Sequence, residues 1–357
     1  MNLKGLATGV GSLPLDNVQK AIDLILRFLP AAPFWPQLPK CDMREGMIAQ
    51  FSENLPGLKI NGGDLKFSAQ DKEKELELFY DRFIAGDLEY FKITPDFARG
   101  LYAFYQRLNS MDLSGVEFIK CQVTGPFTFC AGITDNQGKA ILHDEVLMQA
   151  MVKGLGMKAL WQLEYFKKFG KKMIMFFDEP YLTSLGSGYS GYSGYSGSRG
   201  YPGHSLSNNN EINRIFQELT EGLKSRGCLV GVHCCGNADW GMLMDTSIDI
   251  INFDAFNFQE RFVLYADNLN SFLKKGGIIC WGIVPTQGYN LSQTPEELAQ
   301  KIKSGLDVLV KKGIDRELLL ERLMISPACG LGTLNAQDAE GILTLLNQTS
   351  AFIRKNL

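Results

Sequence analysis

Short apolar runs alternate with longer segments of helical period along most of this chain, most clearly after residue 118. Runs rich in Val, Ile and Phe that are separated by amphipathic helices are typical of a parallel sheet covered by helices. The predicted strands are residues 6–10, 33–38, 118–123, 172–177, 229–233, 248–253, 278–283 and 322–326.

Long helices are expected between these strands, because hydrophobic residues recur there every three or four positions. The predicted helices are residues 144–169, 211–225, about 262–273, a segment beginning at Thr294, and about 337–353. Thr294 can accept a hydrogen bond from the Glu297 backbone, while the Glu297 side chain can bond back to the Thr294 backbone. Pro295 suits the first helical position, so this helix has a well-defined start.

Eight parallel strands with alternating helices favour a (β/α)8 TIM barrel, with residues 1–357 forming a single domain. An open doubly wound sheet is the competing fold. The sequence lacks the Gly-x-Gly-x-x-Gly and Gly-Lys-Ser/Thr phosphate-binding loops of that class. Residues 40–115 are expected to elaborate the N-terminal region with several short helices.

The charge and hydropathy of the chain exclude several partners. Its 357 residues carry a net charge of −3, so no positive surplus is available for nucleic acid or an anionic membrane. Apolar runs are far shorter than the roughly 20 residues of a membrane span, and the first residues do not resemble a secretory signal. Eight cysteines are too sparse for a disulfide scaffold. We therefore expect a cytoplasmic protein with reduced thiols.

Residues 186–203 form a Gly/Ser/Tyr-rich loop insert in which Gly-Tyr-Ser occurs three times in succession. Such a segment cannot build a core. Because it follows a predicted strand end, it would lie on the catalytic face of a barrel. It is either a disordered insert or a mobile lid whose tyrosines cover substrate.

The strongest chemical signal is His233-Cys234-Cys235 at the end of an apolar strand. Alternate side chains of a strand point the same way, so His233 and Cys235 face one side. Imidazole and thiolate together prefer zinc, and Cys329, directly after the last predicted strand, could complete a three-ligand site at the barrel rim. Asp254, at another strand end, is either a fourth ligand, a helix cap or a partner of a ligand.

The chain resembles the catalytic barrel of cobalamin-independent methionine synthase over almost its whole length. The motifs that carry this resemblance are, in chain order, Thr8-Gly9-Val10-Gly11-Ser12-Leu13-Pro14, Val123-Thr124-Gly125-Pro126, Asp178-Glu179-Pro180, His233-x-Cys235 and Pro327-Ala328-Cys329-Gly330-Leu331. His233-Cys234-Cys235-Gly236-Asn237 is also similar to the metal motif of the methylcobamide:coenzyme M methyltransferases. Both groups are relatives within the uroporphyrinogen decarboxylase superfamily, which implies a (β/α)8 barrel.

The resemblance implies a zinc-dependent methyltransferase that methylates a zinc-activated thiol, with homocysteine converted to methionine as the leading reaction. It places Zn²⁺ on His233, Cys235 and Cys329. It also implies that Gly11, Ser12 and Asp178 bind the substrate, with Ser12 and Asp178 at the amino acid end of homocysteine. A coordinating thiol is deprotonated outright, so its sulfur becomes a nucleophile.

The chain departs from the methionine synthases in ways that leave the donor and the acceptor open. It has no room for their second, N-terminal barrel, which favours a corrinoid protein or free methylcobalamin over a methylfolate as the methyl donor. The carboxylate loop that binds the homocysteine amine is not reproduced, and Glu45 or Glu53 could replace it. Asp254 stands where the methionine synthases carry Glu.

Asp178 and Glu179 are adjacent carboxylates at a strand end and are the candidate catalytic residues. They point to opposite sides of the strand, so one can serve the site while the other stabilises the following loop. Asp-Glu-Pro could equally be a plain strand terminator. A methylated folate nitrogen needs a proton to leave, whereas a methylated corrinoid does not, and His143 is another possible acid.

Three further functions compete with this one. A methylcobamide:coenzyme M-like enzyme would use another small thiol. A uroporphyrinogen decarboxylase-like enzyme would act without metal, but Arg27 and Arg44 are the only arginines before residue 82. A non-catalytic module could bind zinc or a corrinoid. Metal content separates the second function from the rest, and turnover identifies the third.

Overall fold

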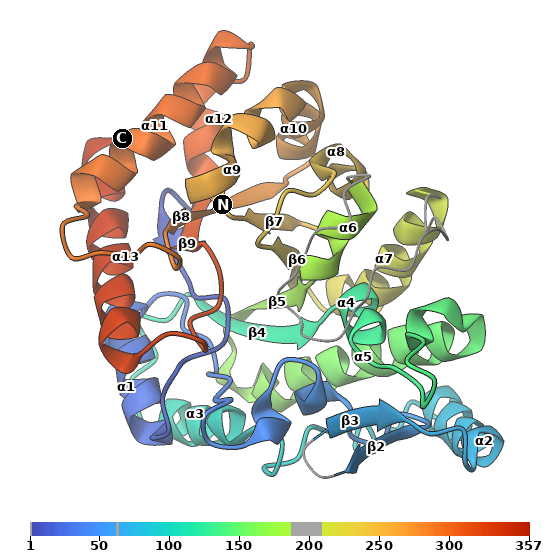
Figure 1. The fold of residues 1–357 in the computed structure, drawn as a ribbon. Helices are drawn as coiled ribbons and strands as arrows, with labels where there is room; N and C mark the ends of the chain where they lie inside the picture. The colour runs from blue at the N-terminus through green and yellow to red at the C-terminus, as the bar shows by residue number, and fades with distance from the viewer. Residues whose placement is uncertain (1, 62–63, 187–208) are drawn as a thin grey trace.

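The computed structural model describes residues 2–61, 64–186 and 209–357, and within these residues seven parallel strands form one curved sheet (Figure 1). In spatial order the strands are β1 (Leu6–Ala7), β9 (Leu323–Pro327), β8 (Ile278–Val284), β7 (Ile250–Phe253), β6 (Leu229–Cys234), β5 (Lys172–Asp178) and β4 (Phe118–Thr124). Every neighbouring pair is parallel. The predicted strands therefore lie side by side in chain order around the sheet.

Residues 33–37 close the gap between the two edge strands. Phe34 pairs in parallel with Lys120 of β4, and Gln37 pairs in parallel with Ser12, beyond the end of β1. The Gln37 backbone N–H donates to the Gly11 carbonyl at 3.0 Å. In the described part of the chain, these bridges complete the ring of eight, so the predicted (β/α)8 barrel is confirmed. The strand predicted at 33–38 is reduced to isolated bridges.

Buried amide side chains reinforce this closing segment, whose two prolines have no N–H for a regular ladder. Gln122 of β4 donates from Nε2 to the Trp35 carbonyl at 2.9 Å. The Trp35 indole donates to Gln162 Oε1 at 2.9 Å, and Gln162 Nε2 donates to the Gln122 carbonyl at 3.1 Å. Side chains thus supply hydrogen bonds that the backbone lacks at this position.

Helices cover the outside of the barrel, as the hydrophobic periodicity predicts (Figure 1). They are α1 (Val18–Phe28), α5 (Glu145–Phe166), α7 (Asn209–Lys224), α9 (Ala255–Phe262), α10 (Ala266–Lys274), α11 (Pro295–Lys311), α12 (Arg316–Glu321) and α13 (Ala336–Asn356). The predicted capping box of α11 is confirmed, since Thr294 and Glu297 bond reciprocally. The helix predicted at about 262–273 is found as α10, which begins four residues later than predicted. A turn of 3-10 helix, Val263–Tyr265, separates α9 from α10 there.

The N-terminal elaboration packs against the barrel. It contains the 3-10 turns Met43–Glu45 and Ala49–Phe51, the strands β2 (Leu58–Asn61) and β3 (Asp64–Phe67), and the helices α2 (Lys72–Ile84) and α3 (Arg99–Asn109). The short helices are as predicted, whereas the antiparallel pairing of β2 with β3 was not anticipated. The Thr124 hydroxyl, at the end of β4, donates to the Met47 carbonyl at 2.6 Å. The elaboration is therefore anchored at a strand end.

Polar residues follow apolar ones along the inner face of the barrel. A buried cluster that includes Phe118, Phe176, Ile250 and Met324 fills one level of the interior. Two residues further along three strands, at the next position on the same face, lie the buried polar residues Asp178, Asn252 and Ser326. The apolar level supports a polar level toward the carboxyl ends of the strands, which is where barrel enzymes place their active sites.

Two expectations concern the surroundings of the barrel. None of the helices in the described residues combines the length and the apolar content of a transmembrane span. The loop predicted at 186–203 lies outside the described residues, apart from Gly186 at the end of α6 (Thr183–Gly186).

Candidate metal centre

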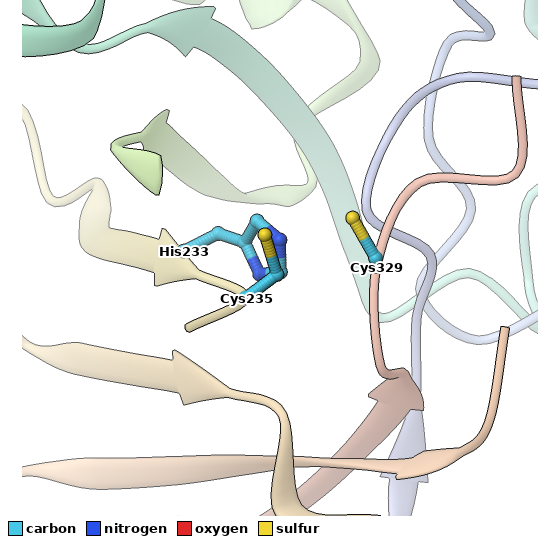
Figure 2. A group of neighbouring side chains, drawn as sticks. All are labelled: His233, Cys235 and Cys329. Atoms are coloured by element: carbon cyan, nitrogen blue, oxygen red, sulfur yellow. The ribbon is translucent and has the colours of Figure 1, made fainter. Parts of the chain in front are cut away.

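The structure brings the predicted His233, Cys235 and Cys329 together at the carboxyl end of the barrel (Figure 2). One nitrogen of His233 and the two sulfur atoms all lie within 4.8 Å of one another. His233 belongs to β6 and Cys235 follows that strand, whereas Cys329 lies two residues after β9. The His233 side chain is buried, but the two cysteines remain partly exposed, so a further ligand could approach their sulfur atoms.

Cys329 is held in place by the β1 loop. The Leu331 backbone N–H donates to the Ser12 carbonyl at 3.0 Å, and the Gly332 N–H donates to the Ser12 hydroxyl at 3.1 Å. A Cβ on Gly330 would lie 2.4 Å from that hydroxyl, so glycine allows this close approach without a shift of Ser12. The predicted substrate-binding segment at Gly11 and Ser12 therefore lies beside Cys329.

His233 presents one ring nitrogen to the cluster and uses the other for a hydrogen bond. Its Nδ1 lies 2.7 Å from Oδ1 of Asn252, a fully buried residue of β7. Its Nε2 is buried and has no hydrogen-bond partner within residues 2–61, 64–186 and 209–357. Burial lowers the pKa of His233, but Cys235, Asp178 and Asn252 raise it, and the net shift is upward.

The two thiols share their protons unequally. The hydrogen bond from Cys329 lowers the pKa of Cys235, burial opposes this, and His233 lowers the pKa further. The same hydrogen bond and burial raise the pKa of Cys329 well above its usual value, because a second thiolate would lie beside the first. The cluster thus holds one negative sulfur readily, and a bound cation would stabilise two.

Asp178 faces the same cluster. It pairs with His233 in the register of β5 and β6 and is buried, and its Oδ1 has no hydrogen-bond partner among the residues described. Burial raises the pKa of Asp178 to about 6, although Lys120 and His233 lower it. This carboxyl group can therefore change charge near neutral pH.

Glu179 is directed away from the cluster, toward α4 (Pro126–Ala131). Its carboxylate accepts from the Phe127 N–H at 2.9 Å, the Thr128 N–H at 2.8 Å and the Thr128 hydroxyl at 2.7 Å. Burial raises the pKa of Glu179 to about 7, while these hydrogen bonds lower it. Of the two adjacent carboxylates, Asp178 faces the site and Glu179 binds the first turn of a helix.

Asp254 lies outside the group of three. Its Oδ1 accepts from the Asn257 backbone at 2.9 Å and its Oδ2 from the Asn257 side chain at 2.7 Å, so it caps α9. Burial raises the pKa of Asp254, and the hydrogen bonds from Asn257 oppose that shift. The structure shows the helix-cap alternative of the sequence analysis.

Three other candidates from the sequence have different surroundings. Glu53 accepts from the Thr94 backbone and hydroxyl, both at 2.9 Å. Glu45 is buried and pairs with Arg99 at 3.8 Å. His143 is exposed in the 3-10 turn Ile141–His143. The side-chain contacts of Glu53 and Glu45 are made within the N-terminal elaboration, and none of the three residues belongs to the cluster.

Sequence reasoning missed Asn252 and Ser326, which support the cluster from β7 and β9. Asn252 lies on the inner face of its strand, two residues after Ile250 and two before Asp254. A polar residue at an inward position of a predicted buried strand was the signal that could have revealed it.

The donor set fits zinc. One imidazole nitrogen and two sulfur atoms are the ligand types of a catalytic zinc site, which keeps a further position for water or substrate. The bare Nε2 of His233 supplies an observation of this chain in favour of a ligand, since buried polar atoms without partners are uncommon.

The family model described as "Cobalamin-independent synthase, Catalytic domain" matches residues 218–351. That range contains all three cluster residues, and the family is the one that the sequence resembles.

The solved structures that match include the catalytic domain of the GH26 endo-beta-1,4-mannanase of Bacillus sp. JAMB-750, at 14% identity over 72% of this chain and 70% of that chain, with a TM-score of 0.40. A tandem GH20 catalytic module of the pneumococcal exo-beta-D-N-acetylglucosaminidase StrH matches at 10% identity over 98% and 84%, with a TM-score of 0.41. No curated protein sequence matches the chain.

Proposed function

We propose that this protein is a zinc-dependent S-methyltransferase that transfers a methyl group to the thiol of homocysteine and forms methionine. The observation that carries the proposal is the convergence of His233, Cys235 and Cys329 within 4.8 Å. The family match over residues 218–351 supports the same reaction class.

The zinc ion would be held by Nε2 of His233 and the sulfur atoms of Cys235 and Cys329. When bound, zinc supplies deprotonation of a coordinating substrate thiol and keeps its sulfur electron-rich. Both cysteines must lose their protons for this, and the hydrogen bond between them already favours ionisation of Cys235. Cys235 and Cys329 are partly exposed residues, which leaves the substrate an approach to the site.

The acceptor would be oriented by the residues around the cluster. An ionised Asp178 attracts the ammonium group of an amino acid, and its unpartnered Oδ1 is available for that contact among the described residues. Ser12 and Gly11 border Cys329 and would contact the carboxylate end through backbone and hydroxyl groups. Holding the reacting groups in line supplies on the order of 7 to 11 kcal/mol of the barrier.

A methylated corrinoid is the donor that we propose. Its departure needs no proton, whereas a methylfolate nitrogen needs an acid. Glu179 is engaged by α4, and His143 is exposed outside the cluster. Of the acids considered in the sequence analysis, only Asp178 is left to protonate a leaving group. We instead assign Asp178 to binding the amine of the substrate.

The test is a methylation assay with metal-quantified protein. Methylcobalamin and methyltetrahydrofolate are supplied in parallel, each with homocysteine, coenzyme M or another small thiol, and products are identified by mass. We expect one zinc per chain and methionine formed from methylcobalamin. Activity with the folate alone would overturn the donor assignment.

A matched pair of cysteine variants tests the ligands. Cys329→Ser should lower zinc occupancy and abolish turnover. Cys41→Ser is the control, because Cys41 lies outside the cluster and its thiol donates to the backbone carbonyls of Leu15 and Asp16. An unchanged zinc stoichiometry in Cys329→Ser would contradict the ligand set.

A further inference from the structure

We propose that Asn252 is a positioning residue that orients both halves of the ligand cluster with one side-chain amide. The inference rests on the proposed zinc site but goes beyond it, because Asn252 would touch neither metal nor substrate. It concerns how residues 96 positions apart in sequence, His233 and Cys329, are held ready for one ion.

Asn252 lies on β7, between the strand that carries His233 and the strands on the side of Cys329. Its strand, β7, pairs with β6 on one side and β8 on the other, and its register partners are His233 and Cys280. The side chain is fully buried. It lies at 2.7 Å from His233 Nδ1, 2.9 Å from the Cys280 carbonyl and 2.8 Å from the Ser326 hydroxyl.

The hydrogen-bond pattern determines the orientation of the amide. A backbone carbonyl can only accept, so the amide nitrogen of Asn252 must face Cys280. The amide oxygen then faces His233 Nδ1, and since that oxygen can only accept, Nδ1 must carry a proton. In a neutral imidazole the lone pair is therefore on Nε2, the atom that lies in the cluster.

The side-chain amide of Asn252 also forms a hydrogen bond with β9. The Asn252 amide donates to the Ser326 hydroxyl, and that hydroxyl donates to the Pro327 carbonyl at 2.8 Å. These two residues immediately precede the Ala328-Cys329 turn. One amide thus links the strand that carries His233 to the strand that leads to Cys329.

A neutral amide suits this position better than a carboxylate. The site already contains two thiols and the buried Asp178. A further buried negative charge would add like-charge repulsion and desolvation cost. Asn252 supplies the acceptor that selects the imidazole tautomer without adding that charge.

The first test reads the tautomer of His233 in metal-free, reduced protein. The chain has three histidines, so replacing His143 and His204 by Gln leaves His233 as the single imidazole. Nitrogen-15 NMR, recorded at a pH high enough for the His233 ring to be neutral, should show the proton on Nδ1. In Asn252→Leu this preference should be lost, giving a mixture of tautomers. A neutral His233 ring with its proton on Nε2 in the parent protein would overturn the inference, whatever the variants do.

The second test measures zinc affinity by competition with a chromophoric chelator. We expect Asn252→Leu to weaken zinc binding by about 10- to 100-fold. Asn252→Asp, which keeps an acceptor for Nδ1 but loses the donor to Cys280 and Ser326, should recover only part of that loss. Gln162→Leu is the control, because Gln162 is another fully buried amide, on helix α5, that bonds to Trp35 and Gln122 instead. Equal affinities for Asn252→Leu and Gln162→Leu would contradict the role.

The outcomes separate this inference from the proposed function. If the parent protein binds no zinc, the proposed function fails, while the metal-free NMR result still decides the tautomer. If zinc binds normally but the tautomer is Nε2–H, the positioning role fails alone. If Asn252→Leu does not fold, Ser326→Ala serves in its place, with a smaller expected loss of about threefold to tenfold in zinc affinity. An affinity equal to that of the parent would count against the link to β9.

Discussion

Asp178 of β5 lies opposite His233 of β6 as its register partner, so both side chains project from the same level of the barrel. The pairing places a buried carboxyl group next to a buried imidazole, with the charge of Lys120 also acting on the carboxyl group. Lys120 is itself fully buried and donates to Gln122 Oε1 at 3.0 Å. Charge at the proposed substrate site is therefore set by contacts inside the barrel.

Asp178→Asn should remove a pH dependence from substrate binding. Burial raises the pKa of Asp178 to about 6, so this group is protonated below that pH and ionised above it. We expect the KM for homocysteine to rise as pH falls through 6 in the parent, and to be raised about tenfold without that inflection in the variant. Steady-state kinetics from pH 5 to 8 measure this. For mercaptoethanol, which has no ammonium group, the parent and Asp178→Asn should have the same KM. If the KM for homocysteine showed the same inflection in both proteins, Asp178 would not have this role.

Zinc binding should release about two protons per ion between pH 7 and 8. One comes from Cys329, whose pKa is raised well above its usual value by its hydrogen bond to Cys235. The other comes from the pair of His233 and Cys235. This pair carries one titratable proton, whether as a neutral imidazole with a thiol or as an imidazolium with a thiolate. Calorimetry in buffers of different ionisation enthalpy gives the number. Cys329→Ser should release about one, and binding without proton release would refute the thiolate ligands.

Gly330→Ala should destabilise the fold by about 1 to 3 kcal/mol, because the new methyl group collides with the Ser12 hydroxyl. In a Ser12→Ala background the same change should cost less than about 1 kcal/mol, since that hydroxyl is absent. Urea unfolding of the four proteins measures the coupling. Gly115→Ala is the control, because no atom lies within 4 Å of a Cβ there. Additive effects would show that Ser12 and Gly330 do not meet.

Glu179→Gln should lower the free energy of unfolding by about 2 kcal/mol while leaving zinc stoichiometry unchanged. The amide offers a donor group where the first turn of α4 presents the N–H groups of Phe127 and Thr128. Thermal unfolding measures the loss of stability, and metal analysis measures the zinc stoichiometry. A loss of turnover with unchanged stability would instead make Glu179 a catalytic residue.

Lys158→Met should stabilise the protein at pH 7 by at most about 3 kcal/mol. Lys158 is fully buried, and its ammonium nitrogen has no hydrogen-bond partner in the described segments. Burial lowers its pKa to about 8 from 10.5, although Glu53 opposes the shift. Between those values the unfolded chain binds a proton that the folded chain does not, so parent stability rises with pH across this window.

The measurement is the difference in unfolding free energy between parent and Lys158→Met from pH 7 to 10.5. Burial also lowers the pKa of Lys120 to about 8, so the unfolding free energy of both proteins should still rise with pH because of Lys120. The difference in unfolding free energy between the two proteins should vanish near pH 10.5. Exposed Lys20→Met is the control and should show no such window. A constant difference at all pH values would contradict the assignment to Lys158.

Local patterns predicted most of the barrel because they depend on neighbours in sequence. The apolar strands and the Thr294 capping box were visible without coordinates, and the period of the strand placed His233 and Cys235 on one side. The hairpin of β2 and β3 escaped prediction, since its strands contain Lys, Asn and Asp instead of continuous apolar residues.

The amino-acid sequence by itself determined the alternation of strands and helices, the resemblance to one family, and the identity of three candidate metal ligands. Only the tertiary structure decided that residues 33–37 close the ring, that Asp254 and Glu179 bind helix ends, and that Asn252 connects His233 to β9. The reason is physical. Periodicity records which face of an element is buried, whereas hydrogen bonds between distant residues depend on how the closed sheet sets its register.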